Sequence, residues 1–168
     1  ESREDDLENG WQQLCDKHIT KDDIVVGFSA SGTTPFVLSI LKHCRKEGIP
    51  TGCIVNNPHS PIAEWADYEV EVITGPEFVT GSTRMKAGTS QKLILDMIST
   101  TLQIRQGRVE GNKMVNAKLI NHKLIDRACR IFMERNSEYK DYEEVRQLIL
   151  KAGSVKKAEM MISRHFDM

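Results

Sequence analysis

The chain has 168 residues, and its 23 basic and 24 acidic residues leave a formal net charge of −1 at pH 7. This length is enough for one domain with a core of its own, and the balanced charge argues against the large basic surface that nucleic-acid binding requires. No apolar stretch approaches the length of a membrane span, and the acidic residues 1–8 do not resemble a signal peptide. We therefore expect neither a nucleic-acid partner nor a membrane partner.

The cysteines and histidines point to reduced thiols rather than to a metal centre. The four cysteines are scattered without a C-x-x-C pair, and the five histidines show no ligand spacing with them. A cytoplasmic chain with free thiols is the simplest interpretation. We expect no metal and no cofactor.

Apolar patterning divides the first half of the chain into alternating helices and strands. The short β-branched run 24–28 predicts a buried strand, and Pro35 suits the first position of the helix that follows. Residues 68–73 alternate in polarity, which indicates a strand with one wetter face at the edge of a sheet. In chain order we expect a helix at 4–17, a strand at 24–29, a helix at 36–47, a strand at 52–56, a short helix at 62–66 and a strand at 68–73.

The second half is predicted to be helical. A long helix should run to about residue 106, and a second from 112 to 135. A pair of helices at 142–151 and 155–165 then surrounds Gly153. Asp141 and Ser154 stand where N-capping residues are expected.

The order of these elements predicts an α/β fold with a parallel sheet and helical crossovers. In such sheets ligands bind outside the carboxyl ends of the strands, which here are the turn after the first strand and Asn56 after the second. Three strands make a thin sheet, and the chain opens abruptly. We therefore expect a three-layer domain that lacks its first two strands, followed by C-terminal helices.

A turn rich in hydroxyl groups, residues 29–34, is the most informative segment. Its sequence Ser-Ala-Ser-Gly-Thr-Thr joins the first strand to a helix start. Backbone N–H groups, the positive end of a helix dipole and side-chain hydroxyls there point at one place, which is typical of a site for a small phosphorylated ligand. The alternative is an ordinary connection of small residues, but four hydroxyls in six residues exceed what a turn needs.

A second segment, residues 81–90, combines small donors with two cations. Arg84 can bind a phosphate or a carboxylate in bidentate fashion, and Lys86 adds a second positive charge. The alternative is a helix start with a capping hydroxyl, in which Arg84 and Lys86 are solvated. The residues alone leave both interpretations open.

Two acidic positions are candidates for proton transfer or sugar binding. Glu77 follows a predicted strand end, where a carboxylate can bind sugar hydroxyls or act as a base, although a surface turn residue is equally compatible. Glu4, Asp5 and Asp6 form a cluster near the start. Chemistry alone favours a solvated helix face for that cluster.

Four segments taken together match a known family. They are residues 26–35, Asn56-Asn57-Pro58, Gly75-Pro76-Glu77 and the highly specific stretch 81–92. In these segments the chain resembles the sugar isomerase (SIS) fold family and, more narrowly, the N-acetylmuramic acid 6-phosphate etherases. The resemblance covers nearly the whole chain. It implies a flavodoxin-like SIS domain over residues 1–136 and a small ubiquitin-associated-like helical module over 137–168.

The resemblance implies an enzyme of cell-wall recycling, a carbon–oxygen lyase. The family cleaves the D-lactyl ether of N-acetylmuramic acid 6-phosphate and releases N-acetylglucosamine 6-phosphate and D-lactate. Lactate is eliminated from the open-chain sugar and water then adds, so a base removes the C2 proton while an acid assists the departure of lactate. The implied partners are a phosphosugar and a second copy of the chain, in a cytoplasmic homodimer.

The same resemblance assigns the site residues. Counting back without gaps from Ser31 places Glu4 on the glutamate of the family's glycine-alanine-glutamate-aspartate-serine motif, which makes Glu4 the candidate base. Asp5 also matches, while Arg3 and Asp6 depart from the motif. The family's second glutamate and first phosphate loop belong to a segment before this chain begins, so a chain complete as given should be a poor etherase. The implied substrate-binding residues are Ser29, Ser31, Gly32, Thr33, Thr34, Glu77, Ser82, Thr83, Arg84 and Lys86.

A second function remains open at this point. Proteins similar to this fold, such as the glucokinase regulatory protein and SIS-type transcriptional regulators, bind sugar phosphates without turnover. The chain shows no basic recognition helix of the transcriptional kind. Thr33 stands where the etherases often have arginine, which alters contacts to the substrate and not the turn. Glu4 is the residue that favours the enzyme over the sensor.

Overall fold

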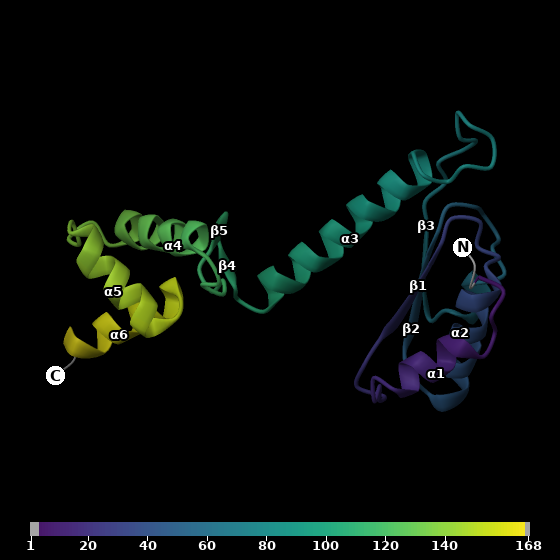
Figure 1. The fold of residues 1–168 in the computed structure, drawn as a ribbon, viewed down its shortest axis with the longest axis horizontal. Coiled ribbons are helices and arrows are strands. Elements are labelled where there is room, and N and C mark those ends of the chain that lie inside the picture. Colours follow the sequence, from purple (N-terminus) through teal and green to yellow (C-terminus); the bar gives the residue numbers. More distant parts are fainter. Residues whose placement is uncertain (1–3, 167–168) are drawn as a thin grey trace. The chain divides into compact units, whose positions relative to one another are not determined.

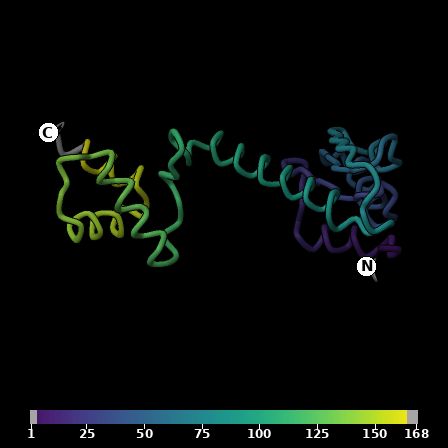
Figure 2. The backbone as a smooth tube through the Cα atoms, turned by 90° about the horizontal axis from the view of Figure 1, so that it is seen from above, coloured from purple at the N-terminus to yellow at the C-terminus, as the bar shows by residue number. Residues whose placement is uncertain are grey.

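The computed structural model describes residues 4–166, which divide into two compact units that meet between Asp96 and Met97. Figure 1 shows the elements of both units, and Figure 2 traces the backbone in a second view. The long helix α3 (Lys86–Arg105) contains the boundary. Within residues 4–166, no helix is long and apolar enough to span a membrane.

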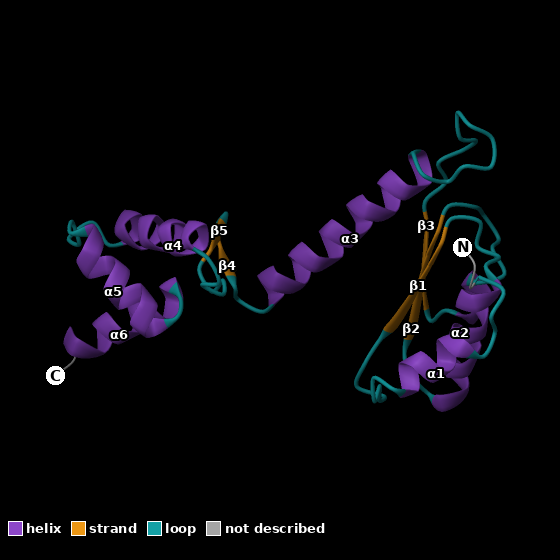
Figure 3. Cartoon of the chain, in the orientation of Figure 1, coloured by secondary structure: helices purple, strands orange, loops and turns teal. Residues whose placement is uncertain are grey.

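The first unit is built on a parallel sheet of three strands in the order β1-β2-β3. The strands are β1 (Val25–Ser29), β2 (Thr51–Val55) and β3 (Tyr68–Glu71), and Figure 3 shows them as orange arrows. Every residue of β2 is buried, but the predicted burial of the run 24–28 is wrong, since Ile24 and Val26 are exposed. The strand order confirms β3 at an edge of the sheet, but all four of its residues are exposed and not those of one face alone. Because the strands are parallel, their carboxyl ends lie at one edge of the sheet.

Helix α2 (Pro35–Glu47) covers one face of this sheet. It begins at Pro35 and ends at Gly48, whose φ of 70° lies in the left-handed region that favours glycine. Gly27 allows the close approach of α2 to β1, since a Cβ at this position would lie 2.5 Å from Cγ1 of Val37. The core between helix and sheet consists of Leu41, Cys53, Val55, Ile62 and Ala63, the last of which belongs to the short 3₁₀ helix η1 (Ala63–Trp65).

Helix α1 (Asn9–Cys15) is shorter than the predicted 4–17. Oδ1 of Asp6 accepts the N–H of Asn9 at 3.0 Å, a side-chain bond typical of a helix start, and residues 4–8 form turns instead. Two bonds fasten these turns to α2: the N–H of Phe36 donates to the carbonyl of Glu4 at 2.9 Å, and the Ser39 hydroxyl donates to the carbonyl of Leu7 at 2.7 Å.

The predicted helix 112–135 is wrong in its first ten residues. A two-stranded antiparallel hairpin, β4 (Val109–Glu110) and β5 (Lys113–Met114), occupies its start, and α4 (His122–Arg135) follows. Gly111 makes the turn between the two strands with a φ of 60°, which lies in the left-handed region that favours glycine. The side chain of Asn121 then accepts the N–H of Leu124 and caps the start of α4.

The second unit has a core of its own, between α4, α5 (Tyr142–Ala152) and α6 (Val155–Phe166). Asp141 and Ser154 accept N–H groups from the first turns of α5 and α6, as expected of N-caps. Arg135 joins the hairpin to α6 through ion pairs with Glu110 at 2.7 Å and Glu159 at 2.6 Å. The division into modules 1–136 and 137–168 stays a prediction.

The fit between β1 and α2 can be tested with two glycines on paired strands. Gly27→Ala should lower the free energy of unfolding by about 1–3 kcal/mol, because the added methyl group overlaps the β-branched side chain of Val37. Gly52→Ala is the matched control, since its Cβ would lie 3.5 Å from its nearest neighbours, an ordinary contact. Urea unfolding followed by circular dichroism measures both variants. Equal stability of the two variants would contradict this packing.

Candidate functional site

The turn after β1 is wound around its own hydroxyl groups. The hydroxyl of Ser29 lies 2.8 Å from that of Thr34 and accepts the N–H of Gly32 at 3.0 Å. The hydroxyl of Ser31 accepts the N–H of Thr33 at 3.2 Å and the Thr33 hydroxyl at 3.0 Å. The N–H groups of Gly32 and Thr33 are therefore used inside the turn. Ser29 is buried there, while Ser31 and Thr33 are exposed.

Gly32 is required at this place for two reasons. Its φ of 73° lies in the left-handed region, and a Cβ there would overlap the side chain of Ser60. The N–H of Ile62 also donates to the Gly32 carbonyl at 3.1 Å. The loop after β2 thus packs directly on the hydroxyl-rich turn and fixes its shape.

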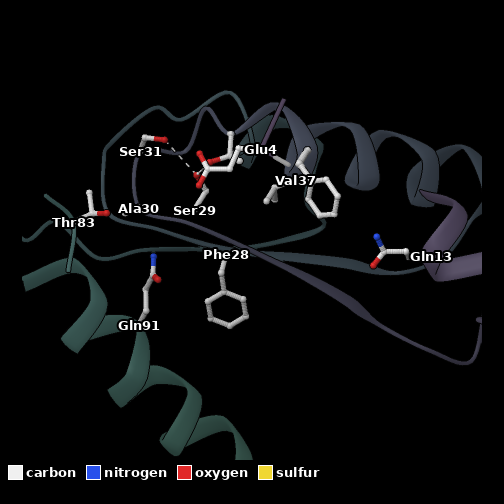
Figure 4. A pocket seen from close by; sticks show the side chains of 11 residues that line it. Glu4, Gln13, Phe28, Ser29, Ala30, Ser31, Val37, Thr83 and Gln91 are labelled. Carbon is white, nitrogen blue, oxygen red and sulfur yellow. Dashed lines mark hydrogen bonds between the residues drawn. The ribbon is translucent and has the colours of Figure 1, made fainter. Parts of the chain in front are cut away.

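A pocket of about 500 Å³ opens at the carboxyl end of β1. Figure 4 shows the Glu4 carboxylate beside the hydroxyls of Ser29 and Ser31 on one side of the strand, with Phe28 and Gln91 on the other. Five residues predicted from the sequence line this pocket, namely Glu4, Ser29, Ser31, Thr34 and Thr83. The other lining residues are Gln13, Phe28, Ala30, Phe36, Val37 and Gln91.

Asn56, directly after β2, connects the pocket to the rest of the sheet. Its side chain is 5% exposed; its Nδ2 donates to the carbonyl of Val72 at 2.9 Å and to the hydroxyl of Ser90 at 2.8 Å. Its Oδ1 accepts from Nε2 of Gln91 at 2.9 Å, and its backbone N–H donates to the carbonyl of Ala30. One buried amide therefore ties the ends of all three strands to α3.

Glu77 caps the start of α3. One carboxylate oxygen accepts the N–H of Lys86 and the other that of Ala87, each at 3.0 Å. The hydrogen bond from Ala87 has the larger effect and that from Lys86 the next; both hold the pKa of Glu77 below its ordinary value. The ammonium group of Lys86 donates to the carbonyl of Pro76 at 2.9 Å and closes the loop between β3 and α3. A direct contact of Glu77 or Lys86 with a ligand stays a prediction.

The other predicted site residues lie around the pocket without lining it. Gly32 and Thr33 shape the hydroxyl-rich turn from within. Ser82 and Arg84 flank Thr83 in the segment before α3, where the N–H of Ser82 bonds the carbonyl of Val79. Ligand contacts of these four residues stay predictions.

A model of the SIS domain family matches residues 11–100, which include the sheet, the turn and the start of α3. The chain belongs to the SIS domain family. The predicted resemblance and the α/β fold with C-terminal helices are thereby confirmed.

Three curated relatives of this SIS protein share the name N-acetylmuramic acid 6-phosphate etherase. The protein of Bacteroides thetaiotaomicron is 53% identical over 165 residues, 98% of this chain and 59% of the relative. That of Porphyromonas gingivalis ATCC 33277 is 54% identical over 93% of this chain and 56% of the relative, and that of Yersinia pestis Pestoides F is 49% identical over 80% and 45%. The chain spans about half the length of the curated relatives that it matches.

Sequence reasoning did not assign roles to three residues of this SIS domain that the structure brings to the site. The place of Asn56 at the end of a strand was expected, and that place is the sequence signal that marks it. Its hydrogen-bond partners Val72 and Gln91 were not expected. Gln91 lies in a long helix and meets Asn56 across 35 positions of sequence. Phe28 reads as a core residue of a buried strand, yet it lines the pocket.

The cap of α3 has a pH-dependent contribution to stability. Because the pKa of Glu77 is lowered by folding, its contribution is present above the ordinary value of 4.5 and is lost as the pH falls through the lowered pKa. Glu77→Gln should therefore be less stable than the wild type at pH 7, and the difference should shrink in acid. Urea unfolding at pH 7 and near pH 3 measures it. Glu69→Gln, at an exposed position of β3, should differ little at either pH, and an equal loss there would refute the cap.

Proposed function

We propose that this chain is the phosphosugar-binding part of an N-acetylmuramic acid 6-phosphate etherase. The proposed reaction cleaves the D-lactyl ether of that sugar and yields N-acetylglucosamine 6-phosphate and D-lactate. Identities of 49–54% to proteins of that name, over 80–98% of this chain, support the assignment. The observation that carries it is the Glu4 carboxylate in one pocket with the hydroxyls of Ser29, Ser31 and Thr34.

The hydroxyl-rich turn is proposed to bind the 6-phosphate. Its hydroxyls are bonded to one another and can turn their protons toward an anion without moving the backbone. They lie at the carboxyl end of β1 and before α2, where the dipole of the helix favours negative charge. Thr83 adds a hydroxyl from the opposite wall, and Arg84 beside it is proposed to supply positive charge.

Glu4 is proposed as the base at C2. In the open-chain sugar the C2 proton is acidified by the neighbouring aldehyde, and a carboxylate is a suitable acceptor for it. The electron pair of the C2–H bond then forms the C2=C3 double bond while the C3–O ether bond breaks. Lactate leaves with a proton from an acid, and water adds at C3 to give the product. The bond from Phe36 to the Glu4 carbonyl holds this residue at the pocket.

We also propose that the protein is cytoplasmic and acts as a homodimer. Four free cysteines, three of them buried, support a reducing compartment. Several large apolar side chains of α3 are 41–60% exposed, which supports association with a second chain: Leu93, Leu95, Met97, Ile98, Leu102 and Ile104. Light scattering after size exclusion should report twice the mass of one chain; a single chain mass at micromolar concentration would reject the dimer.

The activity is tested with the intact gene product that contains these 168 residues. We expect D-lactate release from N-acetylmuramic acid 6-phosphate, measured with a coupled D-lactate dehydrogenase. Glu4→Gln should lower it by about 10²- to 10⁴-fold, the usual contribution of a general base, and should abolish exchange of the C2 proton with D₂O. Asp5→Asn, at the neighbouring exposed carboxylate, is the matched control and should retain exchange.

Three outcomes decide the assignment. Unchanged exchange in Glu4→Gln rejects Glu4 as the base. Loss of C2 proton exchange in both Glu4→Gln and Asp5→Asn indicates that the structure of the segment before α1 is disturbed, and it does not identify a base. Binding of N-acetylmuramic acid 6-phosphate by the wild type without lactate release favours a non-catalytic sugar-phosphate sensor instead.

A further inference from the structure

The pocket at β1 has a second wall whose chemistry differs from that of the hydroxyl-rich turn. Successive side chains of a strand point to opposite faces, so Phe28 faces away from Ser29. Phe28 and Gln91 line the pocket together on the face of the sheet that the start of α3 approaches (Figure 4). This wall therefore combines an aromatic ring with a primary amide and holds no charged side chain among the described lining residues.

The orientation of the Gln91 amide follows from its hydrogen-bond network. The hydroxyl of Ser90 donates its one proton to the carbonyl of Ala87 at 2.8 Å, so it can only accept a hydrogen bond from Asn56. The carbonyl of Val72 is likewise only an acceptor. Both bonds require the Nδ2 group of Asn56, which turns its Oδ1 toward Gln91. Gln91 must then present its NH₂ group to Asn56.

The consequence is a fixed acceptor at the pocket wall. With Nε2 held by Asn56, the Oε1 atom of Gln91 accepts no hydrogen bond from residues 4–166. Asn56 is itself 5% exposed and fully bonded, so the Gln91 amide cannot flip without breaking the buried network. A carbonyl oxygen in a set position, in a pocket that an aromatic ring also lines, suits a ligand group that carries one N–H donor and a methyl group.

We propose that Gln91 and Phe28 form a subsite for the 2-acetamido group of the sugar, with Asn56 as the positioning residue. This inference rests on the proposed function and names the part of the substrate that this wall recognises. The acetamide N–H donates to Oε1 of Gln91, and its methyl group packs on the ring of Phe28. A free amino group at C2 is charged and carries three donors. It finds one acceptor here and has no methyl group to pack on the ring, so the subsite selects N-acetylated sugars.

The test compares two ligands that differ only in the acetyl group, N-acetylglucosamine 6-phosphate and glucosamine 6-phosphate. Calorimetric titration of the intact gene product should give an affinity ratio of about tenfold or more in favour of the acetylated sugar. Gln91→Leu removes the acceptor and should reduce that ratio severalfold. Gln91→Glu places a negative charge there and should shift the preference toward glucosamine 6-phosphate.

Gln13→Leu is the matched control, because Gln13 lines the same pocket from α1 and donates to Asn9. Its affinity ratio should equal that of the wild type. Equal affinity of the wild type for the two sugars, or no binding of either, overturns the subsite whatever the variants do. An equal fall of the ratio in the Gln13 and Gln91 variants also overturns it.

The lactate assay separates this inference from the proposed function. Lactate release with an unchanged ratio in both Gln91 variants rejects the subsite and leaves the etherase assignment standing. If the affinity ratio depends on Gln91 but no lactate is released, the subsite is supported in a protein that binds acetamido sugars and does not cleave them.

Discussion

The buried amide of Asn56 is the interaction on which the site depends. Its backbone and side chain together bond the ends of β1 and β3 and two residues of α3. A buried amide is costly unless each donor and acceptor is paired, and here the pairing is complete only when all three strands and the helix are in place. The fold and the pocket are therefore formed by the same contacts.

Internal bonding also decides which groups remain for a ligand. The N–H groups of Lys86 and Ala87 at the start of α3 belong to Glu77, and that of Phe36 in α2 belongs to the carbonyl of Glu4. For a phosphate group at the turn, these three N–H groups are already bonded, while side-chain hydroxyls of the turn face the pocket. The short segment before α1 thus has two effects, because it caps α2 and brings a carboxylate to the pocket.

Local chemistry made much of this fold predictable. The three parallel strands, the Pro35 start and Gly48 end of α2, and the caps at Asp141 and Ser154 follow from residues close in sequence. The hairpin of β4 and β5 was missed because its backbone pairs, Val109 with Met114 and Glu110 with Lys113, join residues on both sides of the predicted helix start at 112. Helix α1 begins later than predicted, where Oδ1 of Asp6 accepts the N–H groups of Glu8 and Asn9.

The predictable part of the site was its hydroxyl-rich turn. Its second wall was not predictable, since the bond between Asn56 and Gln91 joins residues 35 positions apart and exists only in the packed structure. Glu4 was found through family resemblance alone, because an acidic cluster is ordinarily solvated. In the structure the bonds from Phe36 to Glu4 and from Ser39 to Leu7 fasten its segment to α2.

One pocket at the carboxyl end of β1 is proposed to hold a sugar phosphate between two unlike walls. Amide NMR shifts on titration with N-acetylglucosamine 6-phosphate test it most directly. We predict that the largest changes fall in residues 29–34, at Thr83 and at the side-chain amide of Gln91. Changes that gather instead on the open surface around Arg45 and Tyr68, with none in residues 29–34, would contradict the account.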